Sequence, residues 1–189
     1  MGTIVISTNL SLDGIVQDPD GREGFARGGW FPRSGGADLE QWTRLATDEA
    51  LGAQALLLGR HSDAWFAERW NERTGEWADR LNAMPKYVVS STVEEPRWRN
   101  ATVLGGDVPA AVTKLKERVD GEILVYASYR LGRALLEHGL VDELRLVVFP
   151  VLVGDGERLF GELSGERPVR LTGTRKLGVG LTYLTYEVR

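Results

Sequence analysis

Cysteine is absent from the 189 residues of the chain. Disulfide bonds, thiol nucleophiles and thiolate metal sites are therefore excluded, which is compatible with a reducing compartment. Long hydrophobic runs are absent too, since no segment approaches the roughly 20 apolar residues of a membrane-spanning helix. No basic and apolar leader precedes the first strand pattern. We expect a cytoplasmic protein that has no membrane partner.

An excess of positive charge is also lacking. The formal net charge is -4 and the pI is near 5.3, with Lys and Arg scattered between acidic residues. Nucleic-acid binding needs a clustered basic face, so we expect no DNA or RNA partner. His61 and His138 are not spaced with carboxylates as metal ligands, and no metal site is predicted. Neither a G-x-S-x-G motif nor a P-loop is present, which leaves hydrolase and nucleoside-triphosphatase functions without a motif.

The length suits one well-buried domain, which we expect to cover residues 1–189. Apolar and β-branched runs alternate with segments of helical periodicity, and this pattern is typical of an α/β protein. Strands are predicted at 3–10, 55–58, 86–91, 101–104, 123–125 and 144–153, and helices at 38–53, 62–81 with a break near 74–75, 107–120 and 129–139. The last two alternating segments, 169–177 and 181–188, predict an antiparallel hairpin at a sheet edge. The expected fold is a three-layer sandwich in which helices flank a mixed, mostly parallel sheet.

Two further segments, 18–36 and 65–77, lie outside the predicted strands. The segment 18–36 is rich in glycine and proline and is predicted to be a long loop, a feature that is usually functional or mobile. Trp30 near its end either walls a substrate pocket or anchors the loop by packing. The aromatic residues of 65–77 are expected to pack in the core or an interface more than to bind a ligand.

Small and polar residues follow each of the predicted parallel strands. They occupy 9–13, 59–62, 90–91 and 127–129. Right-handed crossovers place the carboxyl ends of parallel strands at one edge of the sheet, where ligands of open α/β sheets bind. Glycines permit close backbone approach, hydroxyls donate hydrogen bonds and Arg pairs with phosphate. The pattern therefore indicates a site for a nucleotide cofactor.

Four segments in this order resemble a known family. They read SLDG at 11–14, LLLGRHSDAW at 56–65, YVVSS at 87–91, and GLVDELRL followed by FPVLVGDGERLF at 139–160. Together they are similar to the dihydrofolate reductase fold, and specifically to the family that includes the reductase domain of the bacterial bifunctional riboflavin-biosynthesis protein. The resemblance covers nearly the whole chain. It implies an NADPH-dependent reductase, and relatives of this fold are commonly homodimers.

The resemblance also implies roles for individual residues. Gly59, Arg60 and Ser62 would bind the phosphate side of NADPH, and Ser90 and Ser91 would flank its adenosine ribose phosphate. Asn9 and Val16 match positions that line the nicotinamide. The turn that faces the pyrophosphate would be formed by Ala127, Ser128 and Tyr129, and Leu131 is predicted to bind the cofactor with it.

One departure from the family concerns that turn. Relatives often carry Gly-Ser-Gly there, whereas this chain reads Ala127-Ser128-Tyr129. For the cofactor to bind, the side chain of Tyr129 must point away from it, because otherwise that side chain occupies the cofactor's place.

The proton donor is assigned on the same resemblance. Asp38, at the opening of the first long helix, matches by position the catalytic acid of folate reductases, and Glu40 is the alternative. As a purely structural alternative, Asp38 is a helix N-terminal acid that favours the dipole.

Other candidates have structural alternatives as well. Arg60 could pair with a surface carboxylate. Ser90 and Ser91 could be turn formers. Asp13, followed by Gly14, is expected to form a turn, with a catalytic role as the less favoured hypothesis, and the glycines at 154 and 156 also predict a turn.

The sequence thus favours a reductase that transfers a hydride from NADPH to a small pterin- or pyrimidine-like heterocycle. The competing hypothesis is a non-catalytic nucleotide-binding or interaction protein that retains the fold.

Overall fold

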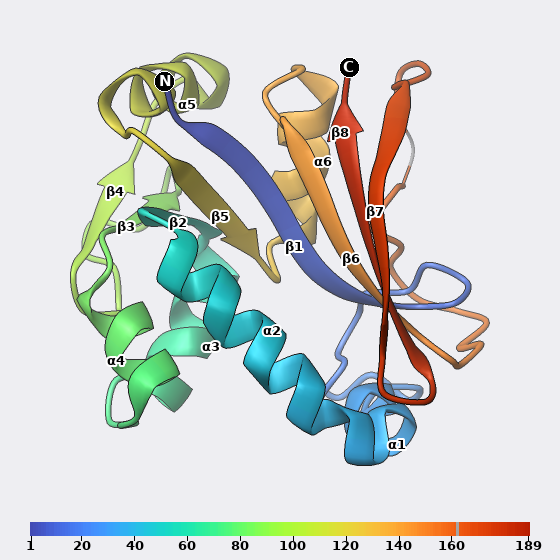
Figure 1. Ribbon diagram of the computed structural model, residues 1–189. Helices are drawn as coiled ribbons and strands as arrows, with labels where there is room; N and C mark the ends of the chain where they lie inside the picture. Colours follow the sequence, from blue (N-terminus) through green and yellow to red (C-terminus); the bar gives the residue numbers. More distant parts are fainter. Residues whose placement is uncertain (162) are drawn as a thin grey trace.

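The computed structural model describes residues 1–161 and 163–189. Within these residues, eight strands form one sheet in the order β4-β3-β2-β5-β1-β6-β8-β7 (Figure 1). The strands are β1 (Thr3–Ser11), β2 (Ala55–Gly59), β3 (Lys86–Val89), β4 (Ala101–Leu104), β5 (Glu122–Tyr126), β6 (Glu143–Phe149), β7 (Val169–Leu177) and β8 (Leu181–Val188). All neighbours from β4 to β6 pair in parallel, whereas β8 is antiparallel to both β6 and β7. The predicted mixed sheet with a C-terminal hairpin at its edge is confirmed.

Helices cover both faces of the sheet. They are α1 (Trp30–Gly35), α2 (Leu39–Gly52), α3 (Arg60–Trp70), α4 (Glu76–Ala83), α5 (Val108–Arg118) and α6 (Tyr129–Glu137), with a short 3-10 helix at Gly36–Asp38. Side chains of α5 and α6 share one core cluster with Ile4 and Ile6, whereas side chains of α2, α3 and α4 share another with Val5. Because successive strand residues point to opposite faces, β1 contributes to both layers of the core.

Strand and helix ends follow local chemistry. Asp107 caps α5 as predicted, since its Oδ2 accepts a hydrogen bond from the N–H of Ala110 at 2.9 Å. The strand predicted to reach residue 153 ends at Phe149, because the next residue is Pro150, which has no N–H for the ladder. The predicted strand 86–91 ends at Val89 and leaves Ser90 and Ser91 in the following turn. The helical region 62–81 is interrupted between Trp70 and Glu76, close to the predicted break.

The segment predicted as one long loop, 18–36, contains the short helix α1. Trp30 at its start is 1% exposed and is a packing anchor, because its ring contacts Phe149 edge-on at 5.5 Å. Its indole N–H donates to the carbonyl of Gln17 at 3.1 Å. Asp18 orders the preceding turn, since its buried carboxylate accepts hydrogen bonds from the N–H groups of Glu23 and Phe25 at 3.0 Å each. Packing and one buried carboxylate hold a segment whose sequence has little periodicity.

Among the described residues, no helix has the length and apolar character needed to span a bilayer.

Candidate active site

A cavity of about 1230 Å³ opens at the carboxyl ends of the parallel strands. It is large enough for a dinucleotide together with a small substrate. All eleven residues predicted to bind the cofactor line it, namely Asn9, Val16, Gly59, Arg60, Ser62, Ser90, Ser91, Ala127, Ser128, Tyr129 and Leu131. The parallel topology thus brings four distant segments to one place.

One end of the cavity, here called the phosphate end, is formed by residues 59–62, 90–92 and 127–130. Helices α3 and α6 both begin there, directly after β2 and β5, and none of the described side chains caps either amino terminus. Ser128 joins the two turns, because its Oγ accepts a hydrogen bond from the N–H of Gly59 at 3.0 Å and donates to Ser62 Oγ at 2.8 Å. Two uncapped helix amino termini, side by side, form a site for an anion.

Arg60 extends from this end without a carboxylate partner within the described residues. Its guanidinium donates to Thr92 Oγ1 at 3.1 Å, which aims it across the cavity rim towards the turn after β3. Ser90 shapes that turn, since its Oγ accepts hydrogen bonds from the N–H groups of Thr92 and Val93 at 3.1 and 3.0 Å. Ser90 therefore forms the turn and lines the cavity as well.

Ala127 has a φ of 51°, in the left-handed region that favours glycine. A residue with a Cβ is strained in this conformation. The ring of Tyr129 lies 5.3 Å from the guanidinium carbon of Arg133, which is itself bound to Glu157 at 2.9 Å. Tyr129 also packs against the core cluster of α5 and α6. Tyr129 is nevertheless one of the residues that line the cavity.

Asp38 lies outside the cavity. Its carboxylate accepts hydrogen bonds from the N–H groups of Val179 and Gly180 at 3.0 and 2.7 Å, in the turn between β7 and β8. These hydrogen bonds lower the pKa of Asp38. Glu40 is exposed and pairs with Arg44 on the same helix. Neither residue lines the cavity, so the prediction that one of them donates a proton does not fit this geometry.

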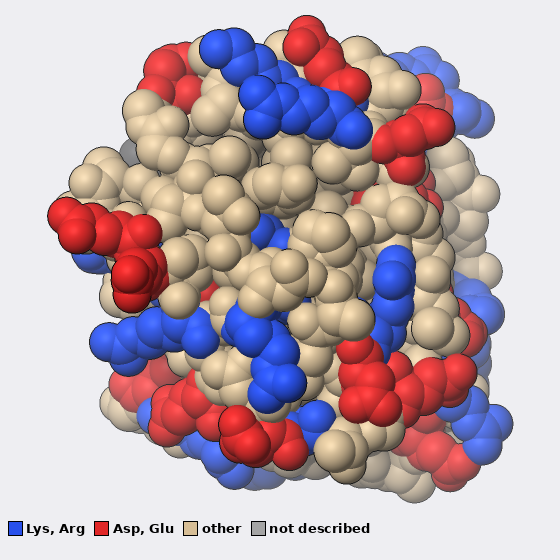
Figure 2. Space-filling view, turned by 90° about the vertical axis from the view of Figure 1, so that its left-hand side faces the viewer, with Lys and Arg blue, Asp and Glu red and all other residues tan. Residues whose placement is uncertain are grey.

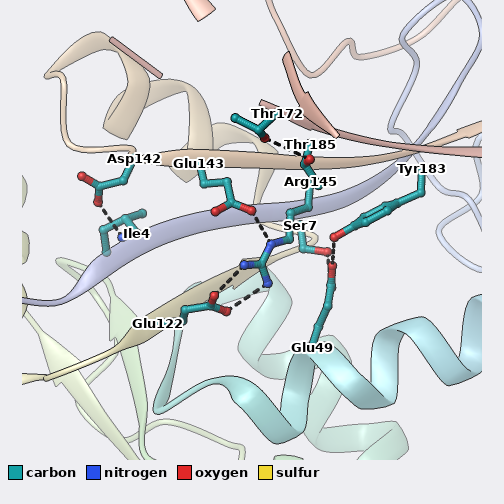
Figure 3. A network of polar contacts seen from close by, with 10 residues as sticks. All are labelled: Ile4, Ser7, Glu49, Glu122, Asp142, Glu143, Arg145, Thr172, Tyr183 and Thr185. Atoms are coloured by element: carbon teal, nitrogen blue, oxygen red, sulfur yellow. Dashed lines mark hydrogen bonds and ion pairs between the residues drawn. The ribbon is translucent and has the colours of Figure 1, made fainter. Parts of the chain in front are cut away.

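Glu49 is the carboxyl group that α2 presents to the cavity. Its side chain is buried, and it accepts hydrogen bonds from Ser7 Oγ at 2.7 Å and from the hydroxyl of Tyr183 at 2.9 Å (Figure 3). Burial raises the pKa of Glu49 above its ordinary value of 4.5, against the opposing effect of these two hydrogen bonds. The sequence held a signal for this residue, because Glu49 falls on the apolar stripe of α2 between Ala46 and Ala50.

Arg145 lies close to Glu49 but is bound to other partners. Its guanidinium bonds both oxygens of Glu122, at 2.6 and 2.9 Å, and Glu143 at 2.6 Å (Figure 3). Register pairing sets Arg145 beside Ser7 on the neighbouring strand. Two carboxylates thus neutralise this cation, and within the described residues Glu49 has only hydroxyl groups as hydrogen-bonding partners.

The other end of the cavity, here called the aromatic end, is walled by Phe31, Trp42, Trp65, Phe66, Trp70 and Trp77. Neighbouring rings meet edge-on, with centroids 4.8 Å apart for Phe31 and Trp42 and 4.6 Å apart for Trp70 and Trp77. The indole N–H of Trp42 donates to Asn9 Oδ1 at 2.7 Å, which ties the wall to β1. The aromatics of 65–77 therefore pack together, as expected, and also line the cavity.

Charge is divided between the two ends. Of the described residues that line the cavity, Arg60 and Arg130 are the only Lys or Arg, and both belong to the phosphate end. Four acids line it as well, namely Asp18, Asp20, Glu23 and Glu49. On the outer face that Figure 2 shows, by contrast, basic and acidic side chains are interspersed around a mostly uncharged centre. No group of three metal-ligating side chains occurs in the described part of the chain.

These features define an α/β protein with a large cavity at the carboxyl edge of its sheet, and comparison with known proteins gives the family. The model of the RibD C-terminal domain matches residues 2–183. The chain belongs to this family. A curated relative, the uncharacterized protein YyaP of Bacillus subtilis, is 29% identical over 107 residues, which are 57% of this chain and 56% of that protein. The chain thus matches about half the length of this relative.

Solved structures show the same fold. A putative riboflavin biosynthesis protein from Shewanella sp. PV-4 superposes with a TM-score of 0.76, at 19% identity and over 99% of both chains. Dihydrofolate reductase from Enterococcus faecalis, complexed with NADP(H), gives 0.59 at 12% identity over 99% and 96% of the two chains. A Thermotoga maritima deaminase and 5-amino-6-(5-phosphoribosylamino)uracil reductase gives 0.65 at 12% identity, over 100% of this chain and 57% of that one. The dihydrofolate reductase-like fold is thereby confirmed.

Proposed function

We propose that this protein is an NADPH-dependent reductase that acts on a small pterin- or pyrimidine-like heterocycle. The observation that carries the proposal is the convergence of all eleven predicted cofactor-binding residues on one cavity with two chemically different ends. Membership of the RibD C-terminal domain family and the reductase names of its structural relatives support the proposal.

The residues of the phosphate end fit NADPH. Two uncapped helix amino termini meet there and would hold the pyrophosphate. At Gly59 the nearest atom to an added Cβ would be Ser128 Oγ, 3.9 Å away, so the turn leaves room for a close ligand. Arg60, Ser90 and Thr92 would bind the adenosine ribose phosphate. When bound, the nicotinamide supplies the hydride.

The protein's own residues would orient the substrate and supply the proton. The aromatic end excludes water and stacks a flat ring. Glu49, with its raised pKa, would hold a proton on a carboxyl oxygen, and Ser7 and Tyr183 would fix that oxygen in place. Glu49 thus takes the role that the sequence assigned to Asp38.

A fluorescence titration tests the proposal. NADPH should quench the tryptophan emission saturably, because four tryptophans line the cavity. The absence of saturable binding up to millimolar NADPH would contradict the proposed function. Arg60→Ala should weaken the binding of NADPH about tenfold and that of NADH little, because a charge-assisted hydrogen bond contributes about 1.5 kcal/mol. Arg170→Ala, on exposed β7, is the matched control and should leave both affinities unchanged.

The strained Ala127 and the bulky Tyr129 favour the second candidate, a non-catalytic nucleotide-binding protein. The discriminating outcome is saturable NADPH binding without consumption of NADPH against any heterocycle of a pterin and pyrimidine panel. A homodimer remains a prediction, which native mass spectrometry tests.

A further inference from the structure

We propose that the aromatic end selects its substrate by charge: it takes a flat nitrogen heterocycle that is neutral or positively charged, and it excludes one that carries a phosphate group. The inference rests on the proposed function, because it assumes that the cofactor fills the phosphate end. It names a substrate class that differs from the phosphoribosyl compound in the name of the Thermotoga maritima relative.

The first argument is the sign of the charges that line the cavity outside the phosphate end. Asp18, Asp20 and Glu23 line it from the loop before α1, and Glu49 lines it from α2. Burial, and then the charges of Asp18 and Asp20, raise the pKa of Glu23, against the opposing charges of His61 and Arg69. A phosphate beside them would be repelled and would lose water without gaining a partner.

The second argument is that nearby cations are engaged elsewhere. Arg145 is held by Glu122 and Glu143. Arg69 stacks on Trp65 at 4.2 Å and pairs with Asp20 at 3.9 Å and with Glu68 at 3.3 Å, and Arg73 stacks on Trp70 at 4.8 Å. Neither of these two arginines lines the cavity. A phosphorylated substrate would therefore find no free cation among the described lining residues of this end.

The third argument is that the aromatic end offers what a cationic ring needs. Faces of tryptophan attract a positive charge. Arginines already stack on Trp65 and Trp70, whereas no Lys or Arg of the described residues stacks on Trp42 or Trp77. Glu49 offers a carboxyl group held by two hydroxyls. If a ring nitrogen takes the proton of Glu49, the carboxyl O–H bond breaks and an N–H bond forms. The resulting carboxylate then faces a ring cation, so that charge is balanced inside the cavity.

Four pyrimidines, titrated calorimetrically into protein saturated with NADP, separate charge from shape. 2,4-Diaminopyrimidine accepts a proton on its ring, uracil is its neutral near-isostere, and uridine and uridine 5′-monophosphate differ only in the phosphate. We expect 2,4-diaminopyrimidine to bind at least tenfold more tightly than uracil, and the monophosphate at least tenfold more weakly than uridine. A monophosphate that binds as tightly as uridine, or more tightly, overturns the proposal.

Glu49→Gln should reduce the preference for 2,4-diaminopyrimidine over uracil about tenfold. Gln is isosteric and still offers Ser7 and Tyr183 hydrogen bonds, and circular dichroism checks that the variant folds. Glu40→Gln, an exposed acid on the same helix, should keep the preference. An unchanged preference in Glu49→Gln removes Glu49 from the proposal and overturns it.

The two proposals fail in different ways. Suppose that NADPH binds and that Arg60→Ala weakens its binding, but that uridine 5′-monophosphate binds as tightly as uridine. Selection by charge is then contradicted, and the proposed function is not. If NADPH does not bind at all, the proposed function falls, whatever the order of the pyrimidines.

Discussion

The carboxylate of Asp13 accepts a hydrogen bond from the backbone N–H of Gly154 at 2.7 Å, across 141 positions of the chain. The same carboxylate accepts from the N–H of Val153 at 3.1 Å and from Ser11 Oγ at 2.6 Å. It joins two of the segments that carry the family resemblance, SLDG and VLVGDG, and ties the turn after β1 to the irregular segment after β6. Asp13 therefore has a structural role in this turn.

Asp13→Asn should lower the free energy of unfolding by about 1 kcal/mol at pH 7, because charge-assisted hydrogen bonds become neutral ones at a partly exposed site. Burial alone would raise the pKa of Asp13, but the hydrogen bonds from Ser11, Val153 and Gly154 outweigh it and lower this pKa to about 2. The stabilisation is thus present above the ordinary pKa of 3.8 and is lost as the pH falls towards 2. Urea unfolding at pH 7 and at pH 3 measures it. Asp155→Asn, in the neighbouring turn, should have little effect, and a pH-independent difference for Asp13→Asn would contradict the prediction.

Glu49→Gln should change stability in the opposite direction with pH. Because burial raises the pKa of Glu49, the folded state holds this proton more tightly than the unfolded state. Wild-type stability relative to the variant is then greatest below the ordinary pKa of 4.5 and declines as the pH rises through the raised value. At pH 8 the variant should be at least as stable as the wild type by thermal unfolding. A constant difference from pH 4 to pH 8 would show that Glu49 ionises normally.

Ala127→Gly should stabilise the protein by about 1 kcal/mol, since the left-handed backbone at φ 51° costs a residue with a Cβ of that order and costs glycine nothing. Chemical denaturation measures the change. The control is Ala111→Gly within α5, where the same substitution should destabilise by about 1 kcal/mol. Destabilisation at both positions would mean that the strain at Ala127 is not relieved by glycine.

Lys86→Met tests how a buried amine at the start of β3 affects stability. Lys86 is 1% exposed, and its Nζ donates to the carbonyls of Met84 and Asn82 at 2.8 and 3.2 Å. Burial, and then the nearby Arg99, lower the pKa of Lys86 to about 8. Between pH 8 and 10 the unfolded state binds more protons, so wild-type stability should rise relative to the variant. Lys114→Met, on the exposed side of α5, should show no such rise.

The meeting of the four strand-end segments in one cavity could be predicted from the sequence, because a residue that directly follows a parallel strand has its position set by topology. Gly59 and Ser128 are examples. The proposed role of Glu49 could not be predicted from the sequence, because the environment of this side chain depends on how α2 packs over β1 and β8. The apolar stripe of α2 indicated only that the side chain faces the core. Asp38 was predicted as the proton donor from its position in the chain. Its carboxylate instead accepts hydrogen bonds from the β7–β8 turn, which is far away in sequence. Helix α1 was missed because Trp30 and Asp18 stabilise it through tertiary contacts.

The hydroxyls that hold Glu49 come from Ser7 in the first strand and Tyr183 in the last. A chain made from its amino terminus displays Ser7 and Glu49 long before Tyr183 leaves the ribosome. Until β8 arrives, the edge of β6 is unpaired and Glu49 lacks one of its two hydroxyl partners. Glu49 therefore gains its second hydroxyl partner only after β8 has been made, whereas Val147 is the last of the described lining residues in chain order.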